Sequence, residues 1–332
     1  MLKAMLKAML KAVMLAMVLA TGGNAFAQTP GHGGEDHSAH GQAAPVNAVL
    51  LDRQLGELRA GIERYRDFNV AKREGWTKFG DEEPLMGAHY SPPNGPDYVH
   101  GDALDFSRPN NLIYMTIGGK KVLTGAAFVV RIAPGDPVPE GFEGSADRWH
   151  VHDFVAAVEA AVEERPIIGW LANAWLDDTY RKKDDNRGRL AMVHVWATEP
   201  NPDGVFADAH RVLPYIALGL PRSHAEGASV EAARGVHLAL KRGCEETLDG
   251  RLWIATATGE QSRRIKLACA TAAKRVRAVL GAGPARLDPA ELNAETEAAW
   301  RELDAFIGMT LSADQKRRIA MMSEHGEDHG GH

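Results

Sequence analysis

Residues 111–132 read NLIYMTIGGKKVLTGAAFVVRI, two apolar runs separated by Gly118-Gly119-Lys120. β-Branched and aromatic residues dominate both runs, and adjacent glycines tolerate the positive φ angles that a tight hairpin requires. The segment therefore predicts two strands, 111–117 and 122–132, joined by a short turn. A similar apolar run at 190–197 predicts a further strand of the same sheet.

Helical patterns flank these strands. Residues 46–74 carry apolar side chains spaced by three or four positions, which predicts an amphipathic helix that stops at Gly75. A second helix is expected at 154–164, with Asp153 as its N-cap. The apolar positions of the first helix are Leu51, Leu55, Leu58, Ile62 and Tyr65.

The C-terminal third of the chain has a helical pattern throughout. Apolar residues recur at helical spacing in 230–242 and in 263–280. Asp288 is followed by proline and then by Glu291, which is typical of a capped helix start. Residues 312–315 read Ser-Ala-Asp-Gln, which is a capping-box pattern for one final helix.

These patterns place the chain in the α+β class. We expect an N-terminal amphipathic helix, a small mixed sheet with one or more helices, and then an all-helical C-terminal region. The expected parts are a signal peptide at 1–27, a disordered His-rich segment at 28–45, an α+β core at 46–222, a helical region at 223–322, and a disordered His-rich tail at 323–332.

The first 27 residues have the pattern of an export signal. Lys3, Lys7 and Lys11 form a basic start, an apolar run covers 13–20, and Ala25-Phe26-Ala27 matches a cleavage site. The apolar run is shorter than the roughly 20 residues that span a bilayer. We therefore expect a periplasmic protein with no membrane span after cleavage, and secretion to the outside is the second option.

The net charge of the chain bears on whether it binds nucleic acid. The formal charge is −6, and loss of the three signal lysines makes it −9. No stripe of clustered Lys and Arg is present, so the sequence argues against a nucleic-acid partner.

The chain contains two cysteines, Cys244 and Cys269, both in segments with a helical pattern. In an oxidising compartment such a pair favours a disulfide between neighbouring helices. The alternative is two separate buried thiols.

Histidines carry the clearest functional signal, because imidazole binds zinc and copper. His150 and His152 are one residue apart, so a strand would point both side chains to the same face. His194 lies in the strand expected at 190–197, and pairing of the two strands would bring it alongside. His89, in a glycine-containing aromatic segment before the first expected strand, could close the site as a fourth ligand. By itself, a His-x-His pair is as typical of a surface accident as of a site, and His89 or His194 alone is more typical of a hydrogen-bonded core histidine.

The two terminal segments also contain histidines, alternating with Gly, Glu and Asp. Such segments cannot form a core, but they can bind ions loosely and exchange them. The alternative is a solvated terminus without a role. The candidate loose sites are His32, His37, His40, His325, His329 and His332.

Four motifs follow one another in the middle of the chain: Met86–Tyr90 (Met-Gly-Ala-His-Tyr), Leu104–Tyr114, Trp149–His152 (Trp-His-Val-His), and His194–Phe206, which contains His-Val-Trp and Asn-Pro-Asp-Gly-Val-Phe. Their order and spacing resemble a family of uncharacterised exported bacterial proteins. The resemblance covers about residues 60–215, and it implies only that the histidine motifs belong together.

Near the C-terminus, Leu311-Ser312-Ala313-Asp314-Gln315 is similar to the Leu-Thr-x-x-Gln motif of small helical periplasmic proteins of envelope stress and metal response. Serine replaces threonine here. The capping box described above explains the same residues without that resemblance.

Taken together, the sequence predicts a periplasmic metal-binding protein, for copper or zinc, in metal homeostasis or resistance. A core site would hold the ion and the terminal segments would gather ions, with another periplasmic protein as a possible partner. One alternative is a metalloenzyme that uses the same histidines with an open coordination position, and with His89, Tyr90 or Asp153 as acid or base. The other is a helical periplasmic chaperone or adaptor with an exposed apolar groove.

Overall fold

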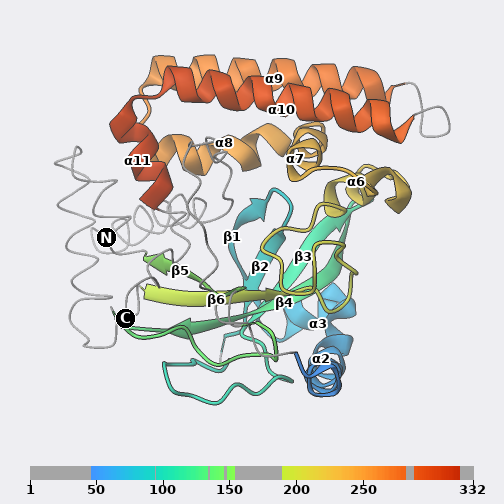
Figure 1. Ribbon diagram of the computed structural model, residues 1–332, viewed down its shortest axis with the longest axis vertical. Helices are drawn as coiled ribbons and strands as arrows, with labels where there is room; N and C mark the ends of the chain where they lie inside the picture. Colours follow the sequence, from blue (N-terminus) through green and yellow to red (C-terminus); the bar gives the residue numbers. More distant parts are fainter. Residues whose placement is uncertain are drawn as a thin grey trace, which may run out of the picture.

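The computed structural model describes residues 46–93, 95–133, 135–145, 148–153, 189–281 and 288–321. The expected signal peptide, both His-rich terminal segments and the helix expected at 154–164 lie outside the described residues. The described parts confirm the α+β class, with a small sheet and a helical C-terminal region (Figure 1).

Among the described residues the sheet has six strands in the order β1-β2-β3-β4-β6-β5, and each pair of neighbouring strands is antiparallel. An isolated parallel bridge joins Val99 to Arg131. The strands are β1 (Thr77–Glu83), β2 (Gly87–Ser91), β3 (Asn111–Ile117), β4 (Lys120–Arg131), β5 (His150–Asp153) and β6 (Arg189–Val195).

The predicted hairpin is confirmed. Gly118 and Gly119 have φ angles of 56° and 77°, the left-handed values of a type I′ turn, and Ile117 pairs with Lys120 across it. Strand β4 therefore begins two residues earlier than the apolar run at Val122. The edge pair β1 and β2 was missed, because β1 is rich in charged residues and has no apolar alternation.

The helix expected at 46–74 is divided into three pieces: α2 (Ala48–Ile62), the 3₁₀ turn η1 (Glu63–Arg66) and α3 (Phe68–Arg73). The Tyr114 hydroxyl donates to the Tyr65 carbonyl oxygen at 2.7 Å, so this backbone oxygen accepts a hydrogen bond from a side chain of the sheet. The Asp67 carboxylate then accepts from the Asn69 backbone N–H and caps a new helix. Gly75 ends the segment, as expected, with a φ angle of 81°.

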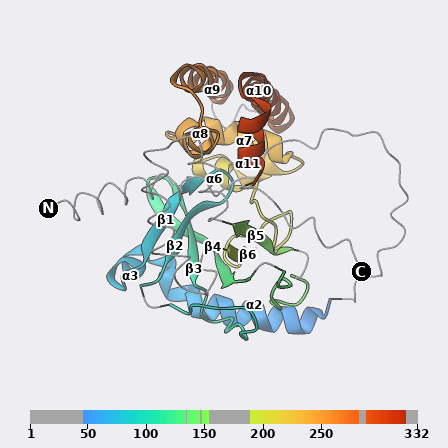
Figure 2. The same ribbon diagram turned by 90° about the vertical axis from the view of Figure 1, so that its left-hand side faces the viewer.

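Each face of the sheet packs against different elements (Figure 2). The face covered by α2 and α3 holds the largest apolar cluster, which includes Leu58, Tyr114 and Phe128. The opposite face carries Ile113, Ala127 and Met192, and it packs against Leu213 of the short helix α6 (Leu213–Ala217). Alternation of side chains along each strand produces this separation.

The C-terminal helices form the upper part of the molecule in Figure 1, where α9 and α10 lie outside α7 and α8. They are η4 (Arg222–Ala225), α7 (Val230–Leu238), α8 (Gly243–Ile254), α9 (Gly259–Leu280), α10 (Pro289–Thr310) and α11 (Ala313–Met321). Asp288 caps α10 through the Ala290 and Glu291 N–H groups. The capping box of Ser312 and Gln315 is also confirmed.

A disulfide joins Cys244 of α8 to Cys269 of α9, with a Cα–Cα distance of 5.8 Å. This confirms the expected pairing and excludes two separate thiols. Among the described helices, none is both long and apolar enough to cross a membrane.

Candidate metal centre

Strands β5 and β6 bring two histidines together on one face of the sheet. His150 pairs with Met192 in the ladder, so His150 and His194 are diagonal neighbours. Their ring centroids are 5.1 Å apart, and both side chains are buried, with exposed fractions of 6% and 1%. The juxtaposition that the sequence predicts for these two residues is therefore present.

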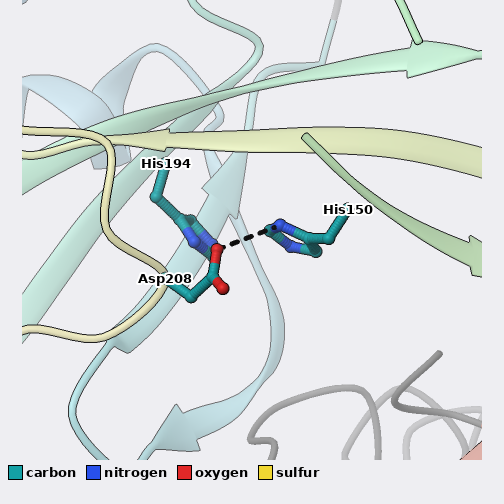
Figure 3. A group of neighbouring side chains, drawn as sticks. All are labelled: His150, His194 and Asp208. Atoms are coloured by element: carbon teal, nitrogen blue, oxygen red, sulfur yellow. Dashed lines mark ion pairs between the residues drawn. The ribbon is translucent and has the colours of Figure 1, made fainter. Parts of the chain in front are cut away.

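Asp208 reaches the same point from the loop that follows β6. The Trp196 backbone N–H donates to the Val205 oxygen, and its indole Nε1–H donates to the Ala207 oxygen at 2.6 Å. These bonds fold the loop back over the sheet. As a result, Oδ1 of Asp208 lies 3.4 Å from Nδ1 of His150 (Figure 3).

His150, His194 and Asp208 form a group that could hold a metal ion, since one ligand atom of each lies within 4.8 Å of the others. Ligand atoms bound to one tetrahedral zinc ion at about 2.0–2.1 Å lie about 3.4 Å apart. Closing the present spacing requires movements of roughly an ångström, which rotation of the side chains can supply. The carboxylate is the most exposed of the three, at 38%.

His89 approaches the group from strand β2. Its Nε2 lies 3.1 Å from Nε2 of His194, which is the spacing of two imidazoles on one ion and also that of a shared proton. Two strands separate β2 from β6: on this stretch of the face β3 contributes Ile113, the direct partner of His89, and β4 contributes Gly125 and Ala127. Small residues there leave room for the two rings to meet above the sheet.

The electrostatic environment keeps the inner histidines neutral. Burial, together with the charge of His150, lowers the pKa of His89 from 6.5 to about 4. Burial and the neighbouring histidines hold the pKa of His194 well below 6.5. Nδ1 of His194 is buried and makes no hydrogen bond to a residue that the structure describes. Neutral imidazoles are the form that binds metal, so these residues fit an ion.

The sequence predicts His152 as a further ligand of this site. It lies on the same side of β5 as His150, with ring centroids 4.9 Å apart, and it is half-buried. It is not among the three residues whose ligand atoms converge.

The structure does not place Tyr90 at the site, so its suggested role as acid or base is wrong. Residues alternate along β2, and Tyr90 therefore faces α3, where its ring packs against Phe68 at 5.2 Å. The side chain of Asp153 and all six terminal histidines lie outside the described residues.

Sequence reasoning did not identify Asp208. The only local signal was its position two residues after Asn201-Pro202-Asp203-Gly204-Val205-Phe206, the motif that follows His194. Asn201 starts this loop with a turn, and its side-chain amide donates to the Ala209 oxygen at 2.8 Å. The motif therefore positions an acidic ligand that pattern analysis alone does not single out.

Comparisons of the chain with family models, with curated proteins and with solved structures gave no match. Functional assignment accordingly rests on the geometry of His89, His150, His194 and Asp208.

Proposed function

We propose that this chain is an exported, periplasmic metal-binding protein that holds one copper or zinc ion in its core. His150, His194 and Asp208 are the proposed ligands, with His89 as the fourth. The observation that carries the proposal is the convergence of these side chains from β5, β6, the loop after β6 and β2. The terminal histidines would gather ions for this site, as expected from their composition.

Three features of the group favour a binding site over an ordinary buried cluster. Its residues come from four separate segments and meet in a buried position. Packing of the sheet alone would favour apolar residues at that position. The pKa values of His89 and His194 are lowered from 6.5, so both imidazoles stay neutral and can bind a metal ion. Finally, an Nε2–Nε2 distance of 3.1 Å suits replacement of a proton by an ion.

A metalloenzyme is the second candidate, because the Asp208 carboxylate is partly exposed and a water or substrate could approach from that side. An adaptor role has less support. Among the described residues of the helical region, the exposed large apolar side chains are Leu267 and Met309, which lie on different helices.

The test is the metal stoichiometry of the purified full chain, with zinc and copper offered separately. The six terminal histidines are first changed to glutamine, which gives a tail-substituted chain without loose sites. We expect it to retain one tightly bound ion, and to lose that ion on the further change His194→Ala. The control is His100→Ala, since His100 is 37% exposed and lies near Asp136.

Circular dichroism of each variant separates a lost ligand from a lost fold. Failure of the tail-substituted chain to retain either metal would overturn the proposal. Retention of the ion by a folded His194→Ala variant would overturn this ligand set. A retained ion and turnover of a substrate that enters beside Asp208 would favour the metalloenzyme.

A further inference from the structure

Met192 occupies the middle of the sheet face that carries the candidate site. It lies directly opposite His150 in the β5–β6 ladder and two residues before His194 on β6. All three residues therefore project from the same face. The Met192 side chain is buried, with 7% of its surface exposed.

The spacing of a sheet places these three side chains within reach of one point. Directly opposite residues have Cβ atoms about 4.5–5.5 Å apart, and alternate residues of one strand are about 7 Å apart. His150, Met192 and His194 thus form a triangle. An ion bound by both imidazoles lies above that triangle, beside the methionine.

We propose that Met192 provides a thioether ligand to this ion, and that the site selects monovalent copper over zinc. This inference rests on the proposed metal-binding function and names its ion. Thioether sulfur is a soft ligand that selects Cu(I), whereas zinc is bound by thiolate, imidazole and carboxylate groups.

The surroundings of Met192 favour an ion of low charge. Met192 packs in one apolar cluster with Ile113, Trp196 and Leu213. Transfer of a charge into such surroundings is costly, and in a continuum description the cost rises with the square of the charge. A monovalent ion therefore enters this environment at a lower cost than a divalent one. Asp208 lies at the exposed side of the group. Its negative charge would stabilise a divalent ion more than a monovalent one.

A matched pair of methionines allows a direct test. Met115 lies in the same apolar cluster and is also buried, with 1% of its surface exposed; it pairs with Val122 and lies diagonal to His89, but it lies opposite neither His150 nor His194. Leucine replaces methionine with little change of volume, so Met192→Leu and Met115→Leu should disturb packing to a similar extent.

The experiment measures the affinity of the tail-substituted chain for Cu(I), by competition with a colorimetric Cu(I) chelator under anaerobic conditions. Ascorbate maintains Cu(I) and spares the Cys244–Cys269 disulfide. Zinc affinity is measured in parallel with a zinc chelator. We expect Met192→Leu to lower Cu(I) affinity by about tenfold or more, with zinc affinity unchanged. Met115→Leu should alter neither affinity.

X-ray absorption of the Cu(I) form should show a sulfur neighbour that Met192→Leu removes. An unchanged Cu(I) affinity in Met192→Leu, with metal still bound, would overturn the thioether proposal and leave the proposed function intact. Equal loss of Cu(I) and zinc would also overturn it, since that result indicates packing. Absence of both metals from the unmutated site would overturn the proposed function itself.

Discussion

Among single residues, Asp208 brings a negative charge from a loop to the buried histidines. Its carboxylate lies against the buried ring of His150 while part of its surface faces solvent. It is the member of the group that solvent reaches most readily, and it supplies the group's one carboxylate.

We predict that Asp208→Asn lowers zinc affinity by about 10- to 100-fold, because the amide keeps the size of the side chain and removes its charge. Competition titration of the tail-substituted chain measures this change. Asp203→Asn is the matched control, since Asp203 lies in the same loop but pairs with Arg211 at 3.2 Å. Equal affinities in both variants would remove Asp208 from the ligand set.

At the level of elements, a buried carboxylate ties three strands together. Glu82 of β1 accepts hydrogen bonds from the Thr116 N–H and hydroxyl of β3, at 2.7 and 2.8 Å, and from the Lys121 ammonium of β4. Burial opposes ionisation of Glu82, but the hydrogen bonds and the charge of Lys121 outweigh it and hold its pKa below 4.5. The edge hairpin thus depends on an ionised group.

A lowered folded-state pKa means that the contribution of Glu82 to stability is complete above pH 4.5 and declines as the pH falls through the folded value. We predict that Glu82→Gln is less stable than the unmutated chain at pH 7, and that the difference narrows below pH 4.5. Urea unfolding at several pH values measures it. Glu57→Gln, at an exposed position of α2, should show no such pH dependence. A difference that is constant with pH would refute this account.

At the level of the whole molecule, charged side chains connect the helical layers to the sheet. Arg251 of α8 interacts electrostatically with Asp304 of α10 and with Glu83 of β1. Burial lowers the pKa of Arg251, and these two carboxylates act in the opposite direction. One guanidinium is therefore shared by two helices and an edge strand.

We predict that Arg251→Met lowers the free energy of unfolding by about 1–3 kcal/mol, because it removes a charged partner from the buried Glu83 and the half-buried Asp304. The control, Arg317→Gln on α11, removes an exposed ion pair with Asp314 and should change stability little. Chemical denaturation followed by circular dichroism distinguishes them. An equal effect of both substitutions would show that Arg251 does not connect the layers.

Local patterns in the sequence determined much of the secondary structure and part of the site. Paired glycines specify the turn at 118–119, since few other residues adopt its φ angles. Asp288 and Ser312 start helices because their side chains accept hydrogen bonds from backbone N–H groups only two or three residues farther along the chain. The His150–His152 spacing likewise specifies a shared face, because strand geometry has a period of two.

Contacts between distant segments were decided by the tertiary structure alone. His89 and His194 are 105 residues apart, and they meet because of strand order and two small residues on β4. Asp208 depends on a loop that folds back through the bonds of Trp196. Strand order and loop closure are set by the packing of the whole core, so no spacing within a single segment encodes them.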